Sequence, residues 1–100
     1  MKLGIFVNTS GHPAAVAGIT NAALAQGHTV SIFVMDDGTR LLSDPSFTAL
    51  SGQAGVTMAF CDHSAQHLGT KPASLPATVA AGSQFENATM NHEAYRVIVL

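Results

Sequence analysis

Three side chains suited to thiol or soft-metal chemistry lie close together in the chain. Cys61, the only cysteine, is followed by His63 and His67. The two histidines are four residues apart, so a helix would present them on one face. A thiolate is the reactive nucleophilic form of cysteine, and thiolate and imidazole together also suit zinc or copper. The spacing therefore leaves two chemistries open.

Cys61 stands between two segments of different character. The run Gly55–Phe60 is mostly apolar and predicts a strand, whereas Asp62–Leu68 is polar and compatible with a helix. Such a junction lies at the open edge of an α/β sheet, where the positive end of a helix dipole favours a thiolate. Most free cysteines are small buried hydrophobes, and the adjacent charge of Asp62 opposes a thiolate. Both interpretations of Cys61, reactive and structural, remain open.

A metal site around Cys61 would need more ligands than the segment supplies. Structural zinc takes four ligands, and the fourth would have to be Asp62 or His12. His63 and His67 are also compatible with an ordinary polar helix face. Metal binding is therefore an alternative hypothesis rather than the leading one.

Polar residues elsewhere in the chain give weaker evidence for a functional site. Asp36 and Asp37 suit acid–base work or magnesium, but Asp-Asp-Gly is also an ordinary turn sequence, and we favour the turn. Ser10 and His12 precede a predicted helix and could bind an anion there. The chain has neither a phosphate-binding loop nor a dinucleotide-binding glycine motif, so nucleotide binding has no support. A triad of Ser10, His12 and Asp36 lacks the nucleophile elbow.

The elements that must position these groups alternate between strands and helices. Apolar runs predict strands at residues 2–7, 29–35, 56–60, 77–81 and 95–100. Helical segments are predicted at residues 14–26, 39–42, 47–53, 62–68 and 83–93, the last opened by an S-x-x-E capping box. This alternation implies parallel pairing through right-handed crossovers, hence a three-layer α/β/α sandwich with a mostly parallel five-stranded sheet. Cys61 would then lie at the carboxyl edge of that sheet, where functional residues gather.

Composition limits the classes of partner and compartment. One hundred residues predict one domain over residues 1–100, and a single cysteine forms no internal disulfide. The 4 Lys and Arg residues form no basic stripe, so nucleic acid is not expected as a partner. No apolar run reaches transmembrane length, so we expect a cytoplasmic protein with no membrane partner. Only 10% of residues are charged, which favours a homo-oligomer whose apolar faces meet other subunits.

Four stretches of the chain together resemble the DsrE/DsrF family, which includes the TusD-type sulfur-relay subunits. The stretches are Leu3–Asn8, Gly27–Gly38, Gly55–Cys61, and Thr78–Gly82 with Tyr95–Leu100. The third looks like the family's strand that ends in the sulfur-carrying cysteine. The resemblance implies a DsrEFH-like sandwich of flavodoxin-like architecture, with no cofactor and no metal.

The resemblance also implies a task for Cys61. It would carry sulfane sulfur as a persulfide, between sulfur-donor and sulfur-acceptor proteins, in a trimer or hexamer. His63 or His12 would tune the thiol, and backbone N–H groups near the start of the following helix would stabilise its anion. Such a protein is a sulfur carrier, a candidate sulfurtransferase rather than a classical turnover enzyme. The alternatives are a non-catalytic binding or structural module in which Cys61 is incidental, and a metal-binding protein using Cys61, His63 and His67.

Overall fold

Five parallel strands form the central sheet. A computed structural model describes residues 1–100. The strands are β1 (Lys2–Val7), β2 (Thr29–Val34), β3 (Val56–Cys61), β4 (Val79–Gly82) and β5 (Arg96–Val99). Their order across the sheet is β4-β3-β2-β1-β5, and every neighbouring pair is parallel. The predicted sheet is therefore confirmed, with all five strands parallel.

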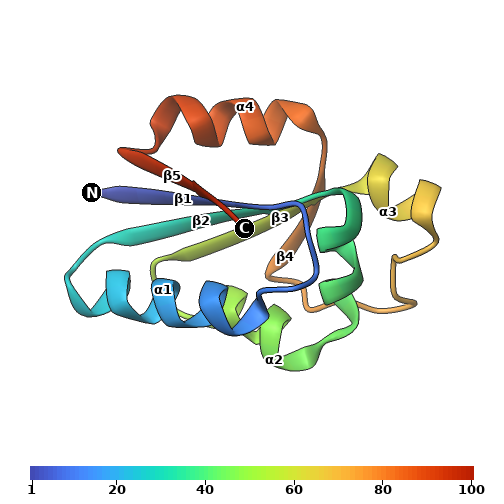
Figure 1. The fold of residues 1–100 in the computed structure, drawn as a ribbon, viewed down its shortest axis with the longest axis horizontal. Coiled ribbons are helices and arrows are strands. Elements are labelled where there is room, and N and C mark those ends of the chain that lie inside the picture. Colours follow the sequence, from blue (N-terminus) through green and yellow to red (C-terminus); the bar gives the residue numbers. More distant parts are fainter.

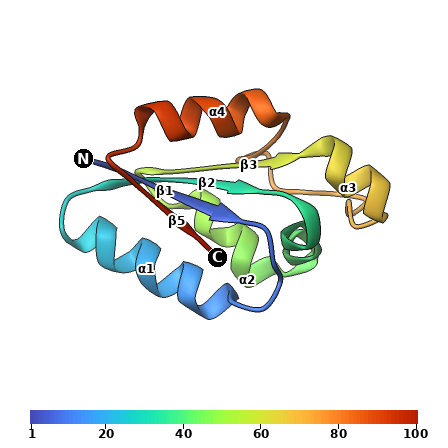
Figure 2. The same cartoon turned by 45° about the horizontal axis from the view of Figure 1, so that its top comes forward.

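Helices cover the two faces of the sheet unequally (Figures 1 and 2). The helices are α1 (Pro13–Ala25), α2 (Pro45–Thr48), α3 (Asp62–Leu68) and α4 (Gln84–Glu93), with 3₁₀ helices η1 (Asp36–Ser43) and η2 (Ala49–Gly52). α4 lies alone above the sheet, α1 and α2 lie below it, and α3 projects beyond the carboxyl edge. From β1 to β4 the chain crosses the sheet in one direction, and right-handed connections keep α1 and α2 on one face. The return to β5 reverses the direction and places α4 opposite, which completes the three layers.

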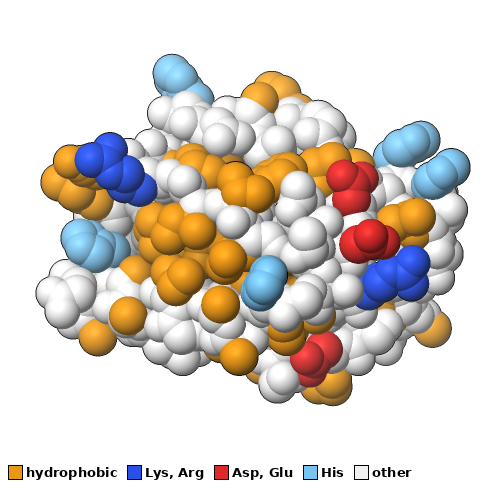
Figure 3. Space-filling model, in the orientation of Figure 1, with side chains coloured by type: hydrophobic (Ala, Val, Ile, Leu, Met, Phe, Trp, Pro, Cys, Tyr) orange, Lys and Arg blue, Asp and Glu red, His pale blue; other side chains and the backbone are white.

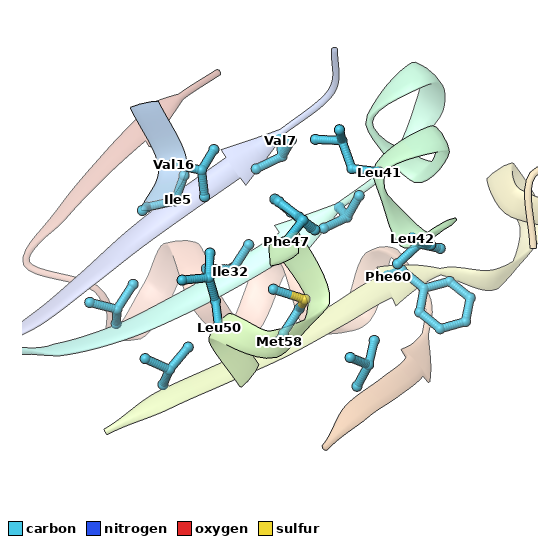
Figure 4. Close-up of a cluster of buried hydrophobic side chains, with 14 of the residues drawn as sticks. Ile5, Val7, Val16, Ile32, Leu41, Leu42, Phe47, Leu50, Met58 and Phe60 are labelled. Atoms are coloured by element: carbon cyan, nitrogen blue, oxygen red, sulfur yellow. The ribbon is translucent and has the colours of Figure 1, made fainter. Parts of the chain in front are cut away.

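The main hydrophobic core fills the face covered by α1 and α2. Ile5, Ile32 and Met58 lie side by side in the register of the strands and point into this core. Buried side chains of the covering helices pack on them, among them Val16 and Phe47 (Figure 4). Successive side chains along a strand point to opposite faces of the sheet, so the residues next to these three in each strand point to the other face.

The opposite face is much less covered. Its buried cluster consists of Phe33, Cys61 and Met90. A groove of about 300 Å³ runs between α4 and strands β2 to β4, and Thr57 on its floor is exposed. α4 thus covers only part of this face, and it does so next to Cys61.

Local signals explain where α4 and α3 begin and end. The Ser83 hydroxyl accepts a hydrogen bond from the Phe85 N–H at 3.2 Å, and the Glu86 carboxylate accepts one from the Ser83 N–H at 2.5 Å. These bonds form the predicted capping box, which supplies partners for two otherwise unpaired N–H groups. α3 ends at Gly69, whose φ of 67° is the left-handed conformation that glycine adopts readily.

After β2, the sequence predicted a turn at Asp36-Asp37-Gly38 followed by a short helix over residues 39–42. The structure instead has a single 3₁₀ helix, η1, over the whole segment. η1 is continuous from Asp36, which has a positive φ of 49°. The Asp36 carbonyl accepts a hydrogen bond from the Thr39 hydroxyl at 2.7 Å, and Asp37 pairs with Arg40 at 3.2 Å. The two aspartates therefore start and brace η1.

No helix of the fold has the length and apolarity required to span a membrane.

Candidate functional site

Cys61 is the last residue of β3 and the N-cap of α3. Its Sγ accepts a hydrogen bond from the Ser64 N–H at 3.4 Å, as the oxygen of a usual N-cap residue would. The side chain is 4% exposed and belongs to the small cluster with Phe33 and Met90. The predicted strand-to-helix junction is therefore confirmed, and the thiol lies at the carboxyl edge on the α4 side of the sheet.

Hydrogen bonds around Cys61 lower its pKa. Burial alone raises the pKa of the thiol, because it disfavours the charged form. Hydrogen bonds from the hydroxyl and N–H of Ser64, from the Gln84 side chain and from the His63 backbone outweigh it. The net pKa lies below the ordinary value of a cysteine. The site thus stabilises a thiolate with neutral donors rather than with a neighbouring cation.

Gln84 is the site residue that the sequence analysis missed. It is the first residue of α4, and its amide also donates to the Met35 Sδ at 3.3 Å. The Gln84 side chain is, in addition, one of the causes that lower the pKa of Cys61. β3 and β4 are paired with Cys61 opposite Gly82. This pairing brings the residues that follow β4 close to Cys61, so a prediction of the strand order would have indicated Gln84.

Asp62 does not act on Cys61 as the sequence suggested. Its carboxylate accepts hydrogen bonds from the Lys71 Nζ at 2.8 Å and from the Gln66 amide at 2.6 Å. The hydrogen bond from Lys71 has the largest effect and lowers the pKa of Asp62, whereas burial raises it. The charge of Lys71 and the bond from Gln66 lower the pKa further, so the net shift is downward. The negative charge beside the thiol is therefore balanced by a cation on the following loop.

The histidines lie away from the sulfur. His63 and His67 share the predicted helix face, where their exposed rings stack with centroids 6.2 Å apart. Of His63, only the backbone contributes to the lowered pKa of Cys61. His12 is exposed at the N-terminus of α1, the helix on the opposite face of the sheet. The fold thus does not bring either imidazole into hydrogen-bond contact with the thiol.

The predicted metal ligands do not form a cluster. No group of three or more His, Cys, Asp or Glu side chains is arranged to hold a metal ion. Cys61 points into the α4 side of the sheet, while the His63 and His67 rings stack on each other at the surface. The alternative of a metal centre built from these three residues therefore lacks a geometric basis.

Comparisons with known proteins agree with the fold. The model of the DsrE/DsrF-like family matches residues 1–100. The YchN protein from E. coli has a similar structure, with a TM-score of 0.73 at 14% identity over 100% of both chains. The protein MTH1491 from Methanobacterium thermoautotrophicum, titled as being of unknown function, has a TM-score of 0.71 at 15% identity, over 99% of this chain and 98% of that one. At these identities the likeness shows a shared fold. No curated protein matches the chain.

Proposed function

Because the chain belongs to the DsrE/DsrF-like family, we propose that it carries sulfane sulfur as a persulfide on Cys61 and passes it to a thiol of a partner protein. The observation that supports this most is the hydrogen bond from the Ser64 N–H to the Cys61 Sγ. An N–H donor aimed at sulfur stabilises the thiolate, and the thiolate is the attacking species in sulfur exchange.

The proposed transfer has two balanced steps. The Cys61 thiolate attacks the outer sulfur of a donor R–S–SH, a Cys61–sulfur bond forms, and R–S⁻ leaves. The terminal sulfur then bonds to an acceptor thiolate, and Cys61 departs as a thiolate again. No oxidant or reductant is consumed, so a single cysteine is sufficient.

The residues around Cys61 would have different roles in this transfer. Ser64 and Gln84 hold the sulfur anion with uncharged donors, and His63 contributes its backbone N–H. Tuning of the thiol by the imidazoles of His63 and His12 stays a proposal, and neither ring is hydrogen-bonded to Cys61. Asp62, being paired with Lys71, is left without a chemical role.

The partners belong to the same proposal. We propose cytoplasmic sulfur-donor and sulfur-acceptor proteins, and a homo-oligomer, a trimer or hexamer, for this chain. Apolar side chains gather in the middle of the face shown in Figure 3, which includes the free edge of the sheet at β5. Tyr95, just before β5, is 50% exposed, and Val99, the last residue of β5, is 61% exposed. An apolar patch around an unpaired edge strand favours contact with another subunit.

Intact mass measurement tests the carrier role. The reduced protein is incubated with inorganic polysulfide, desalted and weighed beside Cys61→Ser. We expect a gain of one sulfur atom in the wild type and none in the variant, and transfer of that sulfur to an added small thiol. His67→Ala is a matched control on the same helix and should gain the sulfur normally. No gain in the wild type would instead favour the structural module in which Cys61 is incidental.

A further inference from the structure

Cys61 is closed off by α4. Its side chain is 4% exposed and belongs to a cluster with Met90 of α4. Gln84, in the first turn of α4, follows β4, and its amide donates to Met35 after β2 at 3.3 Å, so its side chain crosses the end of β3, where Cys61 lies. A sulfur donor or acceptor must reach the Sγ along the line of the new bond, and in this conformation the approach is covered. Exchange therefore requires a movement that uncovers the sulfur.

α4 is the layer held least firmly to the rest of the molecule. Of its ten residues only Met90 is buried, whereas Phe85 is 74% exposed. Two further ties connect α4 to the sheet side: the Gln84 amide to Met35 at 3.3 Å, and Glu93 to Lys2 at 3.9 Å. The ion pair between Lys2 and Glu93 is exposed, and exposed ion pairs contribute little to stability. Few buried apolar contacts are the physical mark of a region that opens locally.

α4 also has the means to move as a unit. Its capping box and the bond from the Thr89 hydroxyl to the Phe85 carbonyl at 3.0 Å lie within the Ser83–Glu93 segment. α1 differs, because it buries Val16, Thr20 and Ala23 on the opposite face. A helix stabilised internally and docked by one side chain can separate from the sheet without unfolding the main core.

We propose that α4 is a lid over Cys61, held shut by Met90 and Gln84, and that the thiol reacts only while this lid is raised. The proposal concerns regulation of the persulfide site proposed above. It is tested without persulfide, so it stands or fails separately from the carrier role. Where opening and closing are fast, the reaction rate of Cys61 follows the population of the open state.

Alkylation of Cys61 by iodoacetamide measures that population. We expect the native protein to react at least about tenfold more slowly than the urea-unfolded chain, because closed states dominate in a partly protected region. Met90→Ala should raise the native rate by about tenfold or more, since it removes apolar contacts that exist only in the closed state.

Met58→Ala is the matched control. Met58 is 2% exposed in the core on the other face, so the same substitution weakens the fold without touching the lid. In conditions where both variants remain folded, it should leave the native alkylation rate unchanged. Equal acceleration by the two variants would mean that Cys61 is reached only by global unfolding, and would overturn the proposal. So would a wild-type rate equal to that of the unfolded chain.

Hydrogen exchange of the wild-type protein provides a second measurement that needs no variant. The α4 amides should exchange through a local opening, with much lower protection than the β2 amides. The opening constant should match the ratio of native to unfolded alkylation rates. Equal protection of α4 and β2 would show that the lid does not open by itself, and would reject the proposal.

Discussion

The two faces of the sheet are built for different purposes. On the α1 and α2 face, side chains such as Ile32 and Phe47 form a continuous core. On the α4 face, the buried cluster is small and contains the one cysteine, and an open groove lies beside it. A packed face resists any change in volume, whereas a loosely covered face permits local motion at little free-energy cost. Cys61, the proposed sulfur carrier, lies on the less covered face.

The largest expected contrast comes from removing one phenylalanine from each helical layer. Phe47 in α2 is fully buried, so Phe47→Ala should lower the free energy of unfolding by about 3–5 kcal/mol. Phe85 in α4 is mostly exposed, so Phe85→Ala should change it by no more than about 0.5 kcal/mol. Urea unfolding followed by circular dichroism measures both values. A loss of several kcal/mol for Phe85→Ala would show that α4 is docked as firmly as α2, and the contrast between the faces would be wrong.

A smaller contrast comes from two glycines near the carboxyl edge. A Cβ at Gly38 would overlap the backbone carbonyl of Val7, so Gly38→Ala forces two backbones apart and should cost about 3 kcal/mol. A Cβ at Gly82 would meet only the flexible end of the Glu86 side chain, 2.8 Å from its Cδ. Gly82→Ala should therefore cost about 1 kcal/mol or less, from a weakened capping box.

Thermal unfolding of the two glycine variants, with far-ultraviolet circular dichroism, makes this comparison. Gly82→Ala should also raise the iodoacetamide reactivity of Cys61, because the capping box lies in the lid. Gly38→Ala, although more destabilising, should not raise it while the protein is folded. The reverse order of stabilities would indicate that the α4 side is the tightly packed one.

The sequence was sufficient for features that depend on local chemistry. α3 was predicted over residues 62–68 and is found there, because Cys61 ends an apolar strand and Gly69 permits a left-handed stop. The capping box of α4 was predicted from Ser83 and Glu86 for the same reason. A mostly parallel sheet was predicted from the alternation of strands and helices, and in the structure all neighbouring strands are parallel.

Features that depend on the meeting of distant segments were beyond the sequence. Gln84 influences the pKa of Cys61 because β4 pairs with β3, and no local pattern marks that side chain. The charge of Asp62 looked unfavourable until the fold brought Lys71 to it across a loop. His63 appeared suited to tune the thiol, but on α3 its ring turns to His67 instead. Contacts of this kind are fixed by loop paths and packing.

The smallest expected effect concerns the contribution of α4 to the thiolate. Gln84→Ala removes one neutral donor, so the pKa of Cys61 should rise toward its ordinary value while the bonds from Ser64 remain. Gln66→Ala is the matched control, because that amide bonds to Asp62 and should leave the pKa of Cys61 unchanged. The ultraviolet absorbance of the thiolate, followed against pH, measures both. Equal midpoints for Gln84→Ala and the wild type would mean that α4 covers the sulfur without stabilising its anion.

The same lowered pKa fixes how stability depends on pH. The folded pKa of Cys61 lies below the unfolded value, so the native state binds the proton less tightly. The stabilisation by the thiolate is therefore fully present above the unfolded pKa and is lost as the pH falls through the folded pKa. Relative to Cys61→Ser, the wild type should gain stability as the pH rises between these two values, and Gln84→Ala should reduce that gain. Urea unfolding across this range detects the slope, and a slope of opposite sign would mean that burial outweighs the donors and that the closed site favours the neutral thiol.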